Sequence, residues 1–261
     1  MKLSTLAPAF AVTAVFALAF VLTGAAAPPV TPKSGYDYLT PETRQLQDDD
    51  FANPGMLWVE EGERLWSEPA GTSGQSCASC HGDAATSMRT VATRYPAWSQ
   101  SEGKVINLEQ QINQCRGRQG AEPLQYESEP LLSLTAFVSH QAKGLPMSVA
   151  VDGPAAQSFE RGKAFFYQRR GQLNLSCANC HEDHAGDHLR ADVISQGQVN
   201  GFPIYRALWQ TMGSTNRMFA WCNEAVRAEP YAAGSQEYVD LELYLRWRGQ
   251  GLAVETPAVR R

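Results

Sequence analysis

Apolar residues recur at helical spacing in two stretches of the chain, residues 131–138 and 238–245. In both stretches they occupy positions i, i+3 and i+7, which places their side chains along one stripe of an α-helix. Gly144 and Gly249 follow these stretches, and glycine commonly stands just past the end of a helix. The pattern predicts two helices, each with one buried face.

Two further helices are predicted around residues 61–66 and 161–166. Gly62 and Gly162 hold the same position in these two segments. Glycine inside a helix costs about 1 kcal/mol relative to alanine, so a close approach by another helix is the expected reason for its presence. We therefore predict that the first and last helices of each segment cross near these glycines.

These helix pairs belong to an internal repeat. Equivalent residues are 100 positions apart early in the repeat and 107 positions apart later. The pairs are Gly62 and Gly162, Cys77 and Cys177, Pro96 and Pro203, and Cys115 and Cys222. One insertion of seven residues explains both offsets, and such a fixed period indicates duplication.

The repeat predicts two tandem, mainly α-helical domains, residues 51–152 and 153–261. Residues 28–50 are largely polar and contain prolines, so we expect an extended N-terminal arm there. Residues 251–261 show no periodicity and are expected to lie along the surface as a tail of the second domain. The joint between the domains is expected at residues 151–154.

Residues 1–27 are typical of a cleaved signal peptide. The chain begins with the positively charged Lys2, followed by an apolar stretch over about residues 6–22. The small residues Gly24 to Ala27 then supply a cleavage site, which is the usual order in a signal peptide. The alternative is a retained membrane anchor. No later stretch is long and apolar enough to span a bilayer. We expect the mature chain in the periplasm, without membrane attachment.

Composition narrows the class of protein. The 261 residues are 43% hydrophobic and 19% charged, the balance of an ordinary globular protein. The formal net charge of −5 argues against a nucleic-acid-binding protein, which would present a basic face. A local basic site for a small anion remains compatible with this charge.

Four of the six cysteines form two copies of Cys-x-x-Cys-His, at residues 77–81 and 177–181. Two thiols at this spacing can add to the vinyl groups of a haem, and the adjacent histidine then ligates the iron. One copy could be a redox Cys-x-x-Cys beside an unrelated histidine, but two copies predict two covalent haem c groups. The predicted haem residues are Cys77, Cys80 and His81, and Cys177, Cys180 and His181. The motifs and the helix pairs together resemble two tandem cytochrome c-like domains.

The remaining cysteines, Cys115 and Cys222, are candidates for the sixth iron ligand. Both lie 19 residues after the matched proline of their repeat. No methionine after the first haem motif has a methionine partner 107 residues later, the offset of the repeat in this region. We predict that Cys115 ligates the first haem and Cys222 the second. A Cys115–Cys222 disulfide and two inert buried thiols remain alternatives. Weaker rival ligands are His140, His184 and His188.

A thiolate ligand would change what the haem can do. Iron keeps the sulfur deprotonated, and the thiolate donates electron density to the metal. Methionine ligation raises the potential of a cytochrome c, so thiolate in its place should lower it. The pattern suggests that the cysteine sulfur itself reacts.

The combination of these features resembles the SoxA family, the dihaem subunits of bacterial sulfur oxidation. The resemblance rests on the two haem motifs, the two distal cysteines, residues 222–230 and the ending at residues 248–260. It implies an L-cysteine S-thiosulfotransferase that works with a monohaem SoxX subunit and joins thiosulfate to a cysteine of the carrier SoxYZ. Electrons would pass to an acceptor cytochrome c. Cys222 would be the active cysteine and Cys115 a structural ligand.

Arginines are the expected partners of thiosulfate, since guanidinium groups suit sulfonate oxygens. Four lie near Cys222 or the chain end: Arg217, Arg227, Arg246 and Arg248. The family places one arginine about a turn before the active cysteine and one near the Arg-Gly-x-Gly ending, which implies substrate binding by Arg217 and Arg248. Met218 stands where the first is expected, so the chain departs from the family there.

Other dihaem functions are compatible with part of this pattern. An electron-transfer cytochrome explains both haems but not the two cysteines. A thiosulfate dehydrogenase would make tetrathionate without a carrier protein. A dihaem peroxidase needs one haem with an open or displaceable ligand. The identity of the product separates these alternatives.

Overall fold

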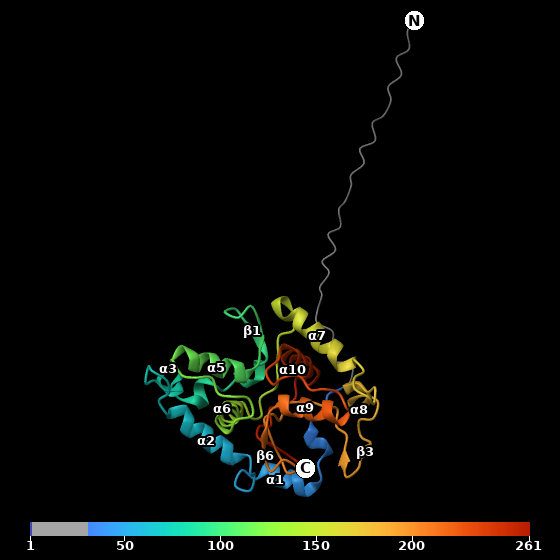
Figure 1. Cartoon of the computed structure of the whole chain (residues 1–261), viewed down its shortest axis with the longest axis horizontal. Helices are drawn as coiled ribbons and strands as arrows, with labels where there is room; N and C mark the ends of the chain where they lie inside the picture. Colours follow the sequence, from blue (N-terminus) through green and yellow to red (C-terminus); the bar gives the residue numbers. More distant parts are fainter. Residues whose placement is uncertain (2–30) are drawn as a thin grey trace.

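The computed structural model describes Met1 and residues 31–261 (Figure 1). The predicted leader, apart from Met1, and the first residues of the predicted arm fall in residues 2–30, outside the described part. We refer to residues 51–152 as the N-terminal half and to residues 153–261 as the C-terminal half. None of the helices within residues 31–261 is long and apolar enough to cross a membrane.

The N-terminal half is built from helices and one short hairpin. Its helices are α2 (Met56–Ser67), α3 (Cys77–His81), α4 (Ala84–Ser87), η2 (Ala92–Arg94), α5 (Leu108–Arg118) and α6 (Glu129–His140). The antiparallel hairpin consists of β1 (Ala97–Ser99) and β2 (Lys104–Ile106).

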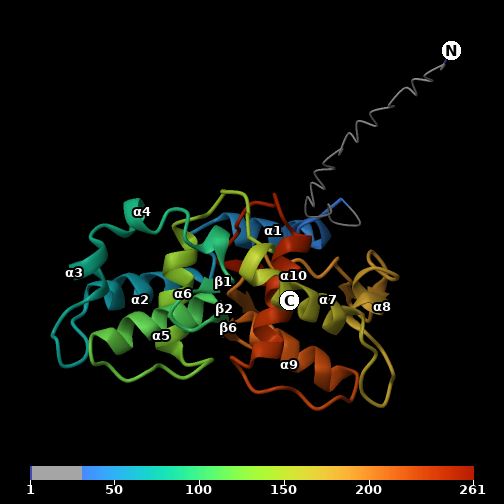
Figure 2. The same cartoon turned by 90° about the horizontal axis from the view of Figure 1, so that it is seen from above.

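The C-terminal half has the same order of long helices. Its helices are η3 (Gly153–Ala155), α7 (Ala156–Tyr167), α8 (Cys177–His181), α9 (Thr215–Ala225) and α10 (Gln236–Arg248). Figure 2 shows α2, α3 and α5 on one side of the molecule, α7, α8 and α9 on the other, and α6 and α10 toward the middle.

The first and last helices of each half cross at the glycines that the sequence singled out. A Cβ atom on Gly62 of α2 would overlap the carbonyl oxygen of Ser133 on α6. A Cβ atom on Gly162 of α7 would overlap the carbonyl oxygen of Asp240 on α10. The predicted crossing is thus confirmed in both halves, and the contact of helix backbones explains why glycine is present despite its poor helix propensity.

Strands complete the C-terminal half. β5 (Ile204–Arg206) lies in the centre of a three-stranded sheet, antiparallel to β6 (Thr211–Gly213) and parallel to β7 (Ala258–Arg260). A second hairpin, β3 (His188–Leu189) with β4 (Asp192–Val193), follows α8. Strand β5 of the three-stranded sheet ends at Arg206, which pairs with Thr211 of β6 on one side and with Arg260 of β7 on the other.

The C-terminal tail is buried, contrary to the expectation of a surface segment. Val254, Ala258 and Val259 are almost fully buried, and β7 supplies the third strand of the sheet. The tail also hydrogen-bonds to the segment after α6, with Val254 donating to the carbonyl of Leu145 at 2.9 Å. Its pairing partners are distant in sequence, and a segment held by such partners needs no periodicity of its own.

The sequence predicts an extended N-terminal arm, but part of the arm is helical. It forms η1 (Gly35–Tyr38) and α1 (Pro41–Asp48). Thr40 caps α1 and Pro41 occupies its first turn, a combination that favours a helix start. Gln47 at the end of α1 is buried, and its side-chain oxygen accepts hydrogen bonds from Val259 N at 3.1 Å and Arg260 Nη1 at 2.7 Å. The arm therefore holds the tail in place.

The two halves share their hydrophobic cores. Val105 of β2 is buried in the core formed by α7, α9 and α10, although it belongs to the N-terminal half. Met212 of β6 is buried in the core formed by α2 and α6, although it belongs to the C-terminal half. Each hairpin therefore fixes the position of one half against the other.

Candidate functional site

The predicted haem-attachment residues lie on two short, identically capped helices. In α3 the side chain of Ser76 accepts from Ser79 N, and the Ser79 hydroxyl accepts from Ser76 N in return. Ser176 and Asn179 make the same reciprocal pair in α8. These capping boxes satisfy the free N–H groups of each helix start. Cysteines three residues apart, with the histidine next in sequence, are thereby held in fixed register.

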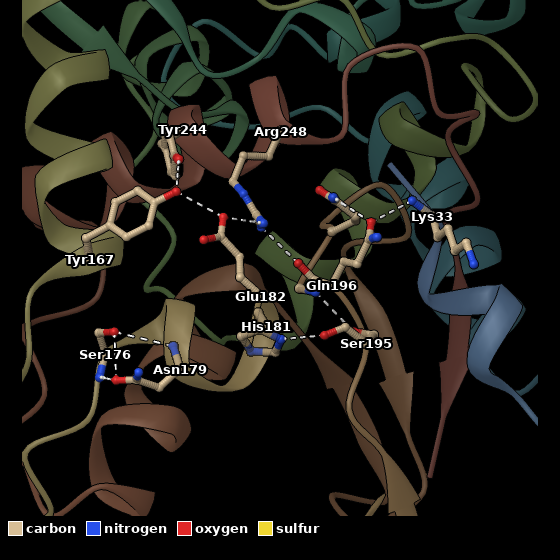
Figure 3. Close-up of polar contacts among 12 residues, drawn as sticks. Lys33, Tyr167, Ser176, Asn179, His181, Glu182, Ser195, Gln196, Tyr244 and Arg248 are labelled. Carbon is tan, nitrogen blue, oxygen red and sulfur yellow. Dashed lines mark hydrogen bonds and ion pairs between the residues drawn. The ribbon is translucent and has the colours of Figure 1, made fainter. Parts of the chain in front are cut away.

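His181 is oriented as an iron ligand would be. Its Nδ1 lies 2.8 Å from the carbonyl oxygen of Ser195, which leaves Nε2 for the metal (Figure 3). Burial lowers the pKa of His181, so its imidazole is neutral at neutral pH, the form that binds iron. A Cβ atom on Gly197 would lie 2.9 Å from the His181 ring. Sequence reasoning missed Ser195 because it stands 14 residues beyond the motif, in a segment without a pattern.

The first attachment site is more open. His81 is exposed and packs its ring against Trp66 of α2, with 5.7 Å between the ring centroids. Cys80 is also exposed, whereas Cys180 is half-buried. Donors in both halves suit a haem c, and the second half encloses its donors more fully.

Cys115 faces the attachment helix of its own half. It lies on α5, where Gln111 Nε2 donates to its Sγ at 3.2 Å. Burial raises the pKa of the Cys77 thiol, and a charge on Cys115 would raise it further, so the two sulfurs are close enough to interact. This arrangement brings the Cys115 sulfur near Cys77, and ligation of the first haem by Cys115 stays a prediction.

Cys222 on α9 is the most strongly perturbed thiol of the chain's described part. Burial raises the pKa of Cys222 to about 12, and charge on Cys177 and Cys180 adds to the rise, whereas Arg206 opposes it. Cys222 therefore faces both cysteines of α8 and one arginine. A thiol in such surroundings becomes a thiolate only when a strong positive partner such as iron binds it.

The alternative of a Cys115–Cys222 disulfide is not found in the structure. All six cysteines are free, and Cys115 and Cys222 each face the attachment helix of their own half. The sulfur atoms therefore remain available as donors.

Arg206 is a functional candidate that sequence reasoning missed. It ends β5, is 8% exposed, and its guanidinium carbon lies 4.3 Å from the ring centre of Trp221. Its Nη1 lies 3.5 Å from Sδ of Met218. Trp221 precedes Cys222, and Met218 lies one helical turn before it. The guanidinium group therefore lies along the part of α9 that carries Cys222. No local sequence pattern signalled this residue, because its contacts with Trp221 and Met218 depend on how β5 packs beside α9.

Arg217 is held on another side of α9. Its guanidinium carbon lies 4.5 Å from the ring centre of Trp209, and its Nη1 donates to the carbonyl of Met212 at 3.3 Å. These contacts attach Arg217 to the β5–β6 hairpin. Among the described contacts, none joins it to Cys222.

Arg248 lies beside His181. It is 1% exposed and donates to Glu182 Oε1 and to the carbonyl of Gln196, each at 2.9 Å (Figure 3). Its guanidinium group also packs over the ring of Phe166. Glu182 also accepts a hydrogen bond from Tyr167 at 3.0 Å. No contact within residues 31–261 brings Arg248 to Cys222, so its predicted substrate-binding role stays a prediction, as does that of Arg217.

Comparison with known proteins places these features in a family. The family model described as SoxA/TsdA, cytochrome c domain, matches residues 61–147. The L-cysteine S-thiosulfotransferase subunit SoxA of Pseudaminobacter salicylatoxidans is 47% identical over 247 residues, which cover 92% of this chain and 86% of that protein. The chain belongs to the SoxA family. The SoxA subunit of Paracoccus pantotrophus is 42% identical, over 87% of this chain and 78% of its own length.

A solved structure agrees with this assignment. The crystal structure of SoxXA from P. pantotrophus matches with a TM-score of 0.86 at 41% identity, covering 90% of this chain and 92% of that one. The predicted membership of the SoxA family is therefore confirmed, and so is a mainly α fold with a cytochrome c domain. Cytochrome c domains carry haem c, which is the predicted kind of cofactor.

Proposed function

We propose that this chain is the dihaem subunit of a periplasmic enzyme that joins thiosulfate to a cysteine of a carrier protein. Membership of the SoxA family makes it a subunit of an L-cysteine S-thiosulfotransferase. The observation that carries the detailed proposal is the position of Cys222, which lies close enough to Cys177, Cys180 and Arg206 to interact with their charges. The periplasmic location rests on the predicted signal peptide, residues 1–27.

Two haem c groups are proposed, one in each half. The capped attachment helices and the opposing cysteines support this number, because both halves present the same donors in the same order. The axial pairs would be His81 with Cys115 and His181 with Cys222. The repeated helix crossing supports two tandem cytochrome c-like domains at residues 51–152 and 153–261.

The partners follow from the family. The matched structure is a SoxXA complex, and we propose a monohaem SoxX-like subunit as the partner of this chain. A SoxYZ-like protein would supply the acceptor cysteine, and a further cytochrome c would receive the electrons. Haem c, when bound, supplies the route for the two electrons that the reaction releases.

The chemistry can be balanced around Cys222. The Cys222 thiolate bonds to the sulfane sulfur of thiosulfate, with loss of two electrons, and gives a Cys222–S–SO₃⁻ disulfane. The carrier's cysteine thiolate then attacks the sulfane sulfur. The bond to Cys222 breaks, Cys222 leaves as the thiolate, and the carrier keeps the S–SO₃⁻ group. Cys222 is half-buried, which leaves its sulfur a side from which the carrier's thiolate can approach.

Arg206 is proposed to hold the sulfonate. It is the arginine whose charge acts on Cys222, and its planar fork suits sulfonate oxygens. Arg206 also has partners, with its Nε donating to the carbonyl of Arg261 at 2.8 Å and its Nη2 lying 4.0 Å from Asp192 Oδ2. It differs from Arg217 and Arg248 because its charge acts on Cys222, whereas no described contact brings either of them to Cys222. We therefore assign the sulfonate contact to Arg206.

Replacement of Cys222 by alanine tests the proposal. Purified complex with Cys222→Ala should keep its covalent haem but lose thiosulfate-dependent formation of carrier-bound thiosulfonate, followed by mass spectrometry of the carrier. Cys115→Ala is the matched control and should retain turnover. Retained turnover in Cys222→Ala, or tetrathionate as the product of the unaltered protein without carrier, would refute the proposal.

Electron paramagnetic resonance on the same proteins tests the axial ligands. Oxidised wild type should show low-spin thiolate-ligated haem signals, one altered by Cys115→Ala and the other by Cys222→Ala. Signals of histidine–methionine type, unchanged by either substitution, would contradict cysteine ligation.

A further inference from the structure

A small cavity lies where the two halves meet, and equivalent residues of the halves line it. Three of its pairs, related by the repeat offset, are Leu108 with Thr215, Thr135 with Glu242, and Ser139 with Arg246. The cavity thus lies near the pseudo-symmetric centre of the molecule. Its volume of about 10 Å³ leaves room for roughly one water molecule.

The cavity lining carries charged side chains from both halves, although the residues equivalent to Glu242 and Arg246 in the N-terminal half are uncharged. Glu242 and Arg246 of α10 stand where α6 carries Thr135 and Ser139. Glu109, the second residue of α5, adds another carboxyl group. All three charged side chains are buried, with Glu109 5%, Glu242 4% and Arg246 6% exposed. Two carboxyl groups therefore share one guanidinium group away from solvent.

The polar contacts leave this cluster incompletely satisfied. Arg246 Nη2 lies 3.9 Å from Glu242 Oε1, and Asn107 Nδ2 donates to Glu242 Oε2 at 3.4 Å. Arg246 Nη1 meets Sδ of Met147 at 3.4 Å, whereas its Nε has no partner among the described residues. An unpaired donor on a buried arginine that lines the cavity indicates a bound water there.

One cation cannot balance two buried carboxylates, so one carboxyl group holds a proton. The groups that face Glu109 are Glu242 and Arg246 on α10, and Tyr126 and Glu127 in the loop between α5 and α6. Burial, reinforced by the Glu242 charge, raises the pKa of Glu109 to about 8. Burial also raises the pKa of Glu242, against the opposing charge of Arg246.

Among the cavity-lining residues, Glu109 and Thr215 lie on the helices that carry the two cysteines proposed as distal ligands. Cys115 follows Glu109 by six residues on α5, and Cys222 follows Thr215 by seven residues on α9. At 1.5 Å per residue, both cysteines lie about 10 Å along a helix from the cavity. The cavity therefore has a comparable separation from both proposed iron ligands.

We propose that Glu109 and Glu242 form a buried proton-binding site that couples proton uptake to reduction of the haems. The proposal rests on the haem ligation proposed above. When an electron reaches an iron, the added negative charge disfavours a nearby carboxylate, and a proton moves from solvent through the cavity water onto the carboxyl pair. By linkage, binding of the proton favours reduction to the same extent. For two unit charges about 10 Å apart at an effective dielectric constant of about 20, such a coupling would be on the order of tenfold in the redox equilibrium.

Spectroelectrochemical titration of the complex with its partner subunit tests the coupling. Between about pH 6 and about pH 10, the midpoint potential of at least one haem of this chain should fall as pH rises, as release of a linked proton requires. Glu109→Gln, which keeps the size and removes the titration, should flatten the dependence. Glu129→Gln alters an exposed carboxyl of α6 and should leave it unchanged.

Infrared difference spectroscopy on the unaltered protein keeps the proposal testable if the variant does not fold. Reduction should increase a protonated-carboxyl band that shifts in D₂O. A pH-independent potential, no such band, or a dependence that survives both Glu109→Gln and Glu242→Gln would overturn the proposal. If turnover still requires Cys222 in that case, only the proton coupling fails and the proposed function stands.

Discussion

Val105 and Met212 occupy equivalent positions in the two halves, and each is fully buried in the core of the other half. Val105 lies on β2 and Met212 on β6, the second strands of two hairpins that precede the cysteine-bearing helices α5 and α9. The exchange makes each core depend on a residue supplied by its neighbour. The two halves should therefore unfold together.

Met212→Ala tests this shared core. Truncation of a fully buried methionine removes contacts and leaves a cavity, so the free energy of unfolding should fall by about 2–5 kcal/mol. Denaturant unfolding measures the change, with Leu57→Ala at an exposed position as the control. If both variants unfold at the same denaturant concentration, the exchange does not stabilise the protein.

The helix crossings predict opposite effects for alanine at different glycines. Gly62→Ala should destabilise the protein because the new Cβ meets the Ser133 carbonyl, and this clash outweighs the gain of about 1 kcal/mol in helix propensity. Gly117→Ala in α5 has open space around the added methyl group and should be neutral or stabilising. Thermal unfolding compares the two, and equal shifts in Tm would contradict the crossing.

The helix crossings and the haem-attachment motifs could be predicted because each depends on local spacing. Gly62 and Cys77 lie within patterns of a few residues. In contrast, α1 was missed because its helix signal, Thr40 before Pro41, is short and its helix is polar. The buried tail was missed because β7 is a three-residue strand whose partner, β5, is distant in sequence.

In the candidate site, too, features with a sequence pattern could be predicted, and features that depend on distant contacts could not. Cys222 was found from the repeat, since it has an equivalent in Cys115. Arg206 has Ser99 as its equivalent, and it reaches Cys222 only through the fold of β5 against α9. Arg248 is close to the chain end in sequence, but a buried ion pair with Glu182 holds it beside His181. Sequence proximity to Cys222 was therefore a poor guide to which arginines approach it.

Arg206→Gln should weaken thiosulfate binding. Loss of hydrogen bonds to a charged group costs about 1.5–3 kcal/mol, so the KM for thiosulfate should rise roughly ten- to hundredfold. Arg206→Lys keeps the charge without the planar fork and should give an intermediate value. Arg190→Gln changes an exposed arginine and should leave KM unchanged. Steady-state kinetics with the carrier protein makes the measurement, and an unchanged KM in Arg206→Gln would remove this residue from the site.

Arg248→Gln separates a role beside His181 from a role in substrate binding. Removal of the guanidinium leaves the half-buried Glu182 without its cation, which should cost less than the loss of about 3 kcal/mol for a fully buried ion pair. We expect a lower Tm and an altered spectrum of the second haem, with little change in the KM for thiosulfate. An increase in KM with unchanged spectrum and stability would instead support the substrate contact implied by the family.

The buried carboxyl pair predicts how stability depends on pH. Burial raises the pKa of Glu109 to about 8 in the folded protein, whereas an unfolded glutamate titrates near 4.3, about its ordinary value. Between these values the unfolded chain binds fewer protons than the folded one, so the stability contributed by this residue is present below about pH 4 and is lost as pH rises toward about 8. Glu109→Gln is neutral throughout and should be more stable than wild type at about pH 8, with the difference shrinking toward about pH 5. Denaturant unfolding at both pH values measures this, with Glu129→Gln as the control. A difference that grows as pH falls would mean that Glu109 is ionised in the fold.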